Sequence, residues 1–179
     1  MKLSVKEWVA LAAALLLPTV LFAASKKSTS NTTALSNLKA FLLMIQFSEG
    51  TLGNKAYRML YGGNLFDDFS KHPNIPVTRW GITSTAAGAY QFLYSTWTEL
   101  QLSLRLPDFS PASQNKAAIE LIRRGGAIDD ILRGHVPQAI NKCRKIWASF
   151  PGAGYGQSEK SLQDLLLFYE KAGGQMATT

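Results

Sequence analysis

The chain of 179 residues has one cysteine, two histidines and few charges, and each shortage excludes a class of protein. Cys143 alone cannot form an internal disulfide or a multi-cysteine zinc site. His72 and His135 have no cysteine or acidic partner at ligand spacing, so we expect no metal and no cofactor. Ordinary glycine and proline contents, with no solenoid repeat, exclude collagen-like, coiled-coil and largely disordered chains.

The charges that are present are mostly basic. Lys and Arg number 19 against 12 Asp and Glu, which gives a net charge of +7 and favours an anionic partner: nucleic acid, anionic lipid or bacterial wall polymer. No nucleic-acid-binding motif accompanies the basic clusters, so we expect no nucleic-acid partner. The clusters comprise Arg123, Arg124, Arg133, Lys142, Arg144 and Lys145.

One long uncharged run lies near the N-terminus. Residues 8–24 carry no charge, and Lys2 and Lys6 precede them. This pattern is typical of an export signal or a short membrane anchor, so we assign residues 1–25 to an N-terminal hydrophobic helix that engages the host secretion machinery and the inner membrane. The protein is then expected to be exported, either tethered to the inner membrane or periplasmic. Whether the segment is cleaved stays open.

A polar stretch separates this segment from the folded part. Residues 26–33 are almost entirely Lys, Ser, Thr and Asn, which is typical of a linker. The remaining part, 34–179, is large enough for one domain with its own core, and we expect a monomer.

The first helix of the domain is predicted over residues 36–49, with Ser36 or Asn37 as its N-cap and Gly50 as its end. Its buried face leads to Glu49, an acid at the C-terminus of a helix. The helix dipole and apolar neighbours should raise the pKa of this carboxyl, as a general acid requires. The alternative, a solvated Glu in the last turn, stays open on this pattern alone.

The middle of the chain has fewer helical signals. Turn-forming residues dominate from Thr51 to Gly81, with a short strand predicted over 76–80, which indicates a small irregular β lobe. Next, Ser84 or Thr85 is predicted to cap a helix whose buried face includes Tyr90 and Trp97.

The last third is predicted to be helical. Ser110-Pro111 opens one helix that ends at Gly125-Gly126; further helices are predicted over 127–133, from Pro137 through Trp147 and Phe150, and over 161–172 with a capping box from Ser161 to Asp164. The loop 151–157 between the last two has three glycines around Tyr155, which suits a flat ring held against a substrate or a simple flexible connection. The fold class is therefore α+β, mostly helical.

Four segments together resemble the endolysin family of bacteriophage lambda. They are Ser48-Glu49-Gly50, the run from Ser84 to Gln91, the run from Leu106 to Gln114, and the run from Trp147 to Gln157. The resemblance implies a lysozyme-like domain. It also implies cleavage of bacterial peptidoglycan between MurNAc and GlcNAc as a lytic transglycosylase, which leaves a 1,6-anhydro sugar and leads to cell lysis.

The resemblance assigns the single catalytic acid to Glu49. Glycosidases with two carboxylates need an acid and a base or nucleophile, whereas attack by the sugar's own C6 hydroxyl needs one group only. The expected glycan-binding residues are Ser48, Thr85, Tyr90, Gln91, Tyr155 and Gln157, and for Tyr90 a core position is an equal alternative.

Two other functions remain. Asp67 could serve as the second carboxylate of a hydrolytic lysozyme, with Asp68 beside it. The chain could instead be an exported, non-catalytic peptidoglycan-binding or inhibitor protein with the same fold, although the presence of Glu49 speaks against this.

Overall fold

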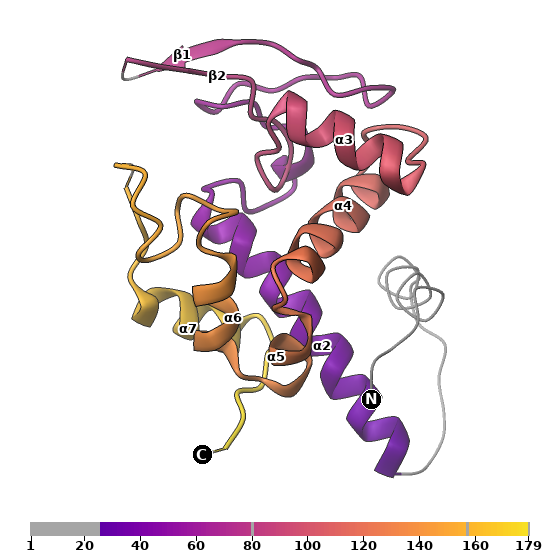
Figure 1. The fold of residues 1–179 in the computed structure, drawn as a ribbon, viewed down its shortest axis with the longest axis vertical. Coiled ribbons are helices and arrows are strands. Elements are labelled where there is room, and N and C mark those ends of the chain that lie inside the picture. Colours follow the sequence, from indigo (N-terminus) through magenta and orange to yellow (C-terminus); the bar gives the residue numbers. More distant parts are fainter. Residues whose placement is uncertain (1–25, 80, 157, 179) are drawn as a thin grey trace. The chain divides into compact units, whose positions relative to one another are not determined.

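The computed structural model describes residues 26–79, 81–156 and 158–178. Its helices and strands follow the order shown in Figure 1: α2 (Lys26–Ser48), the 3-10 helix η1 (Ala56–Arg58), β1 (Val77–Arg79), β2 (Ile82–Ser84), α3 (Tyr94–Leu104), α4 (Pro111–Arg124), α5 (Ile128–Arg133), α6 (Val136–Cys143) and α7 (Leu162–Lys171). The predicted fold class, mostly helical with a small β part, is confirmed.

The described residues form two compact units. Unit 2 comprises residues 45–120, and unit 1 comprises the described residues up to 44 and from 121 onward. The boundaries fall within α2 and within α4.

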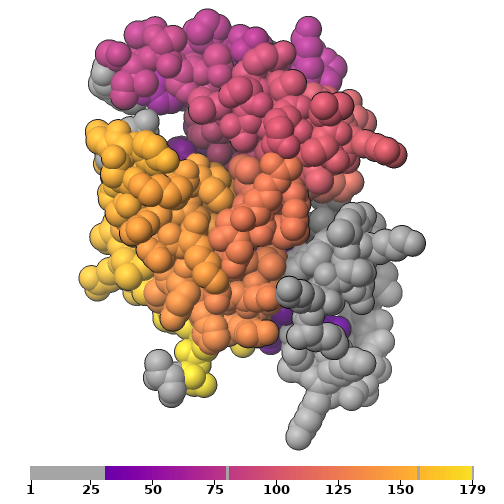
Figure 2. Space-filling view, viewed as in Figure 1, coloured from indigo at the N-terminus to yellow at the C-terminus, as the bar shows by residue number. Residues whose placement is uncertain are grey.

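The β part of unit 2 is a two-stranded antiparallel sheet. Val77 pairs with Ser84 and Arg79 with Ile82. The predicted strand over 76–80 is confirmed for residues 77–79, whereas Pro76 precedes the strand and β2 had no signal in the sequence. On the face seen in Figure 2, residues of α3 lie beside those of the strand-bearing segment.

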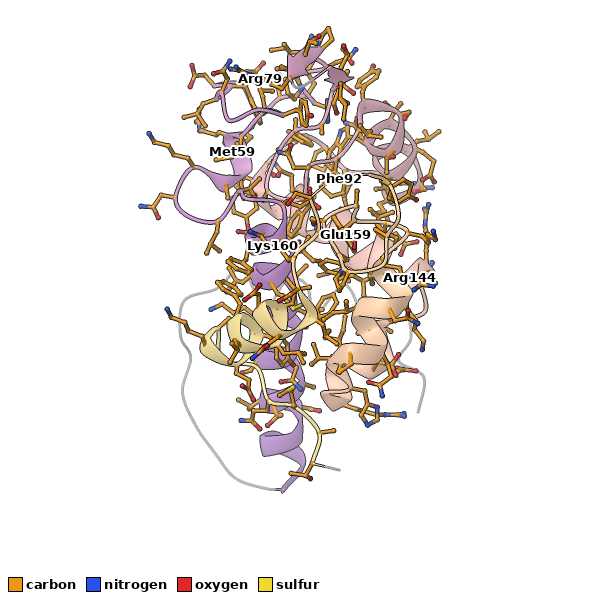
Figure 3. The ribbon with its side chains drawn as sticks, turned by 90° about the vertical axis from the view of Figure 1, so that its left-hand side faces the viewer. Met59, Arg79, Phe92, Arg144, Glu159 and Lys160 are labelled. Atoms are coloured by element: carbon orange, nitrogen blue, oxygen red, sulfur yellow. The ribbon has the colours of Figure 1, made fainter. Side chains whose placement is uncertain are left out.

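The core of unit 2 is aromatic. Trp97 is 1% exposed, and its ring lies edge-on to Phe109 with 4.5 Å between centroids. Phe92, labelled in Figure 3, packs on Trp97 at 5.5 Å, and His72 lies 4.7 Å from Phe109. The predicted core position of Trp97 is confirmed, and the burial of aromatic surface holds the irregular segments of this unit around α3.

Helix α3 begins later than the pattern predicts. Tyr90 is buried in the preceding turn, where Gln91 has a φ of +50° and so cannot continue a right-handed helix. Leu93 is the N-cap of α3, so the predicted cap at Ser84 or Thr85 is wrong. Thr85 nevertheless contacts the start of the helix, because its Oγ1 accepts a hydrogen bond from Tyr94 N at 3.2 Å.

Unit 1 packs α5, α6 and α7 with the first part of α2. The rings of Phe41 and Phe150 meet edge-on at 6.2 Å, and Trp147 lies 6.0 Å from Phe150, which confirms its predicted core position. Helix α6 ends at Cys143, so Trp147 and Phe150 follow it in turns rather than extending it as predicted. The thiol of Cys143 is buried, which raises its pKa from 9.0 to about 12.

Helix α2 begins at Lys26, ten residues before its predicted start. No glycine or proline lies between residues 26 and 49, and once the buried turns are formed each further residue costs little to add. The polar residues 26–33, whose composition predicted a linker, thus form the first turns of α2. Asn37, predicted as a cap, is 1% exposed inside α2, where Nδ2 donates to Leu132 O and Oδ1 accepts from Gln175 N.

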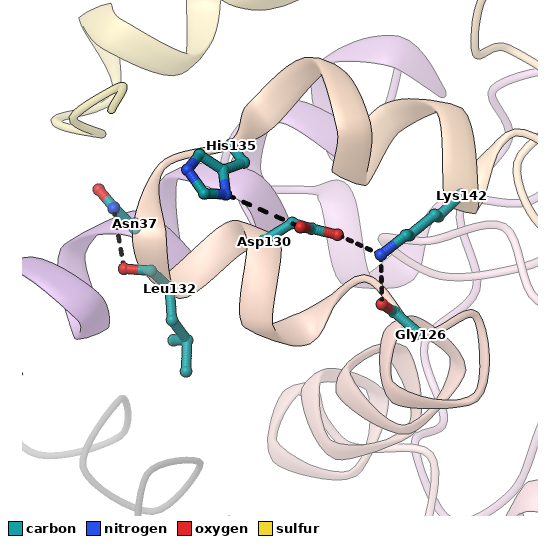
Figure 4. Close-up of polar contacts among 6 residues, drawn as sticks. All are labelled: Asn37, Gly126, Asp130, Leu132, His135 and Lys142. Atoms are coloured by element: carbon teal, nitrogen blue, oxygen red, sulfur yellow. Dashed lines mark hydrogen bonds and ion pairs between the residues drawn. The ribbon is translucent and has the colours of Figure 1, made fainter. Parts of the chain in front are cut away.

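The predicted ends of α4 and the predicted cap of α7 are confirmed, unlike the predicted end of α6. Helix α4 begins at Pro111 and ends before Gly125, and Ser161 Oγ caps α7 by accepting from Asp164 N at 3.0 Å. An ion pair of 2.6 Å between Lys142 Nζ and Asp130 Oδ2 connects α6 to α5, and the same Nζ donates to Gly126 O (Figure 4).

The hydrophobic segment predicted over residues 1–25 lies outside the described residues, and its role in export stays a prediction. Within the described part of the chain, no helix combines the length and the apolar character needed to cross a bilayer.

Gly134→Ala should destabilise the protein more than Gly126→Ala. Both glycines have left-handed backbone, with φ of +81° and +71°, so each alanine incurs about 1–2 kcal/mol of strain. A Cβ on Gly134 would also overlap Gln175 O and lie 2.6 Å from Ala177 N, whereas nothing lies within 4 Å at Gly126. Overpacking should lower the free energy of unfolding of Gly134→Ala by about 1–3 kcal/mol more than that of Gly126→Ala, as measured by urea denaturation. An equal loss of stability in the two variants would contradict the close packing of residues 175–177 against Gly134.

The stability of the fold should fall as the pH drops below 6.5, because of His72. Its ring is neutral and 2% exposed: Nε2 donates to Phe92 O at 2.8 Å, and Nδ1 accepts from Asn74 N at 3.1 Å. Burial lowers its pKa below the ordinary 6.5, so the unfolded chain binds the proton first and stability is lost between 6.5 and the lower folded-state value.

The variant His72→Gln keeps a side-chain donor but has no titrating ring. It should be less stable at pH 7.5, by about 1–3 kcal/mol, and its free energy of unfolding should change less with pH across that window. Parallel pH profiles for the variant and the wild type would refute this role of His72.

Candidate functional site

Glu49 follows directly after Ser48, the last residue of α2, where the helix ends in a Schellman motif. Gly50 is left-handed with a φ of +70°, its N–H bonds Phe47 O, and Thr51 N bonds Gln46 O at 2.9 Å. Glu49 itself, half-buried, remains bonded through its backbone N–H to Ile45 O at 2.9 Å. The backbone of the predicted acid is thus fixed by hydrogen bonds on both sides.

Thr51 attaches this helix end to the segment 86–92. Its hydroxyl, 1% exposed, donates to Ala89 O at 2.7 Å. Gln46, one turn earlier on α2, extends its Nε2 to the hydroxyl of Tyr90 at 3.4 Å. Sequence reasoning missed both residues, although polar side chains beside the apolar face of a helix were a visible signal.

Tyr90 lies at the centre of a buried polar network. Its ring is 2% exposed, and its hydroxyl donates to Asn115 Oδ1 at 2.6 Å, while Tyr57 donates to the same oxygen at 2.9 Å. Burial raises the pKa of Tyr90 well above its usual value, so the hydroxyl stays protonated and able to donate. This is the core position that the sequence offered as one of two alternatives.

The segment after β2 is shaped by two side-chain amides. Gln114, fully buried, accepts from Ala89 N at 2.9 Å and donates to Phe109 O at 2.8 Å and to Tyr57 O at 3.0 Å. The half-buried Gln91 donates from Nε2 to Gly88 O at 3.0 Å and to Met59 O at 3.2 Å. Gly88 is left-handed, and a Cβ there would overlap the Gln114 amide, so only glycine fits.

Ser48 and Thr85 also belong to unit 2. Ser48 is 7% exposed and its hydroxyl donates to Ile45 O at 2.8 Å, while the half-buried Thr85 accepts from Tyr94 N at the start of α3. Unit 2 therefore holds Ser48, Glu49, Thr85, Tyr90 and Gln91.

Tyr155 lies in unit 1, on the predicted glycine-rich loop. Its ring is 54% exposed, its hydroxyl donates to Lys145 O at 3.1 Å, and Lys145 Nζ lies 5.6 Å from the ring centroid. Gln157, the last predicted glycan-binding residue, lies outside the described residues.

The other two candidate acids, both in unit 2, are held by neighbouring groups. Asp67 is exposed and pairs with Arg58 Nη1 at 2.9 Å. Asp68 accepts from Ser70 N at 2.7 Å and from Ser70 Oγ at 2.6 Å, and these bonds lower its pKa. Within the described part of the chain, no group of three or more His, Cys, Asp and Glu could hold a metal ion.

This arrangement is suited to proton transfer by one carboxyl. The backbone of Glu49 is held by hydrogen bonds, and the neighbouring positions Gln46 and Thr51 are bonded to Tyr90 and Ala89 of the same unit. A half-buried carboxyl at a fixed position can give a proton to an oxygen atom and take one back.

Comparison with known proteins identifies the family of this chain. A model of the endolysin family matches residues 39–176. The endolysin of Escherichia phage P2 is 46% identical over 154 residues, covering 77% of this chain and 93% of that protein, and the endolysin of Escherichia phage lambda is 45% identical over 143 residues, covering 76% and 90%.

Solved structures give the same result. The lysozyme of bacteriophage lambda, in a complex with a chitohexasaccharide, superposes with a TM-score of 0.77 and 43% identity, covering 79% of this chain and 96% of that one. A second structure of the lambda lysozyme has a TM-score of 0.72 and 42% identity, with the same coverage. The chain therefore belongs to the endolysin family and has a lysozyme-like fold.

Proposed function

We propose that this protein degrades bacterial peptidoglycan as a lytic transglycosylase, with Glu49 as its general acid and base. Glu49 protonates the oxygen between MurNAc and GlcNAc, and the bond from C1 to that oxygen breaks. The C6 hydroxyl of the same MurNAc bonds to C1 and returns its proton to Glu49. The product is a 1,6-anhydro sugar, and no water is consumed.

The position of Glu49 at the end of α2 is the observation that carries this proposal. The negative end of the helix dipole favours a protonated carboxyl, and the Schellman motif holds the residue in place. The hydrolytic alternative needs a second carboxylate, and Asp67, its candidate, is exposed and paired with Arg58.

The glycan substrate is supported by the lambda lysozyme, which was solved with a chitohexasaccharide. We assign the side-chain oxygen of Gln91 and the hydroxyls of Ser48 and Thr85 to hydrogen bonds with sugar hydroxyls. Tyr155 would stack its exposed ring on a sugar, and Gln157 would bind beside it. Tyr90 acts by holding Asn115 and the end of α2, because its own hydroxyl is buried.

The distribution of charge suits an anionic polymer. The described residues of unit 1 carry eleven Lys and Arg against five Asp and Glu, whereas unit 2 carries six of each. Attraction to an anionic polymer would therefore act through unit 1.

Glu49→Gln should abolish the release of soluble fragments from purified peptidoglycan sacculi while leaving the thermal unfolding midpoint close to that of the wild type. The amide keeps the shape of the side chain but cannot donate an acidic proton. Asp67→Asn serves as the control and should retain activity.

Mass spectrometry of fragments made in isotope-labelled water then identifies the reaction. Anhydro ends without the label support the transglycosylase. Labelled reducing ends would support the hydrolytic alternative with Asp67, and a wild type that sediments with sacculi but releases nothing would support the non-catalytic binding protein.

Tyr155→Ala should raise KM roughly three- to tenfold with little change in kcat, because a stacked aromatic ring contributes about 0.5–1.5 kcal/mol to binding. Tyr155→Phe keeps the ring and loses only the bond to Lys145 O, so its KM should stay near that of the wild type. An unchanged KM for Tyr155→Ala would remove this residue from the glycan site.

A further inference from the structure

The loop that carries Tyr155 is fastened by charged side chains that the reaction does not use. Glu159 is exposed, yet both its carboxylate oxygens are engaged: Oε2 accepts from Gly152 N at 2.8 Å and Oε1 accepts from Gly154 N at 2.9 Å. Figure 3 labels Glu159 with Lys160 and Arg144, both in the same unit. Hydrogen bonds to an ionised carboxylate are among the stronger ones in proteins.

Ala153, the residue between the two glycines, is held by a second charged side chain, that of Lys145. Lys145 Nζ donates to Ala153 O at 3.2 Å, and Ala153 itself is 1% exposed. Three successive residues of the loop are thus held by side chains. Glu159 accepts from the N–H groups of Gly152 and Gly154, and Lys145 donates to the carbonyl oxygen of Ala153 between them.

The same lysine also contacts Tyr155. Its Nζ lies 5.6 Å from the centroid of the ring, and its backbone oxygen accepts from the Tyr155 hydroxyl at 3.1 Å. The position of the exposed ring therefore depends on contacts with Lys145 and on the conformation of the two residues before it.

Both glycines need this support. Gly152 and Gly154 have φ of +74° and +76°, a conformation in which glycine is unstrained but which it leaves easily, because its backbone is the least restricted of all residues. Without the carboxylate, the loop would sample other conformations and present the ring less often.

We propose that Glu159 is a positioning residue for glycan binding: its carboxylate, by holding Gly152 N and Gly154 N, keeps the Tyr155 ring in the orientation that binds a sugar. This proposal rests on the glycan-binding role proposed for Tyr155. The two bonds also lower the pKa of Glu159, so the carboxylate form that accepts them is maintained into mild acid.

The test uses the full chain and three substitutions. Glu159→Gln keeps the length of the side chain but replaces one acceptor oxygen by a donor, so one of the two bonds is lost. Glu170→Gln is the matched control, the same chemical change at an exposed position of α7 in the same unit. Tyr155→Ala removes the ring that the loop presents.

The first measurement is the affinity for chitohexasaccharide by calorimetry. If the loop holds its binding orientation only a tenth of the time in Glu159→Gln and otherwise binds like Tyr155→Ala, the Kd rises about two- to fivefold, less than in Tyr155→Ala. Glu170→Gln should bind like the wild type. Glu159→Gln in a Tyr155→Ala background should weaken binding little further, because both substitutions remove the same contact.

The second measurement is amide hydrogen exchange at Gly152 and Gly154, which should be faster in Glu159→Gln and unchanged in Glu170→Gln. Unchanged affinity in Glu159→Gln, together with weaker binding by Tyr155→Ala, would overturn the positioning role alone. Unchanged affinity in Tyr155→Ala would overturn the role of Tyr155 in glycan binding, and this proposal with it.

Discussion

The end of helix α2 is the constraint on which the candidate site depends. A helix must satisfy its last carbonyls, and here Gly50 and Thr51 do so by turning the chain sharply after Glu49. The same turn brings the Thr51 hydroxyl to Ala89 O, so the segment from 86 to 92 is anchored to the residue after the acid. The end of the helix and the position of the candidate acid are thus set by the same turn, and a longer α2 would displace both Glu49 and the segment bonded to Thr51.

Elements with local stop and start signals were predicted well from the sequence. Helix α4 lies between Pro111 and Gly125, and α7 begins at Ser161, because proline, glycine and a capping hydroxyl act on the residues next to them. Predictions based on composition or period were weaker. The start of α2 was wrong because polar residues can continue a helix that burial has nucleated, and the start of α3 was wrong because a buried Tyr90 fits the period of a helix that its backbone does not join.

The position of Glu49 at a helix end was predictable for the same local reason, whereas its surroundings were not. Thr51 and Ala89 are 38 residues apart, and Gln114 bonds Ala89 across 25 residues, so no window of the sequence contains both partners. A buried glutamine has one acceptor oxygen and two donor hydrogens, which can pair with any carbonyl or N–H that the fold brings near it. Its choice of partners is decided by tertiary packing, and only the three-dimensional structure reveals it.

The burial of Cys143 limits the thiol chemistry of this protein. It is the single thiol of the chain, it is buried on α6, and its pKa of about 12 leaves almost no thiolate at neutral pH. Thiol–disulfide exchange proceeds through the thiolate, so neither glutathione in a reducing cytoplasm nor the oxidising machinery of a periplasm finds a reactive partner here. No disulfide therefore forms within this chain, and its folding requires no oxidation step.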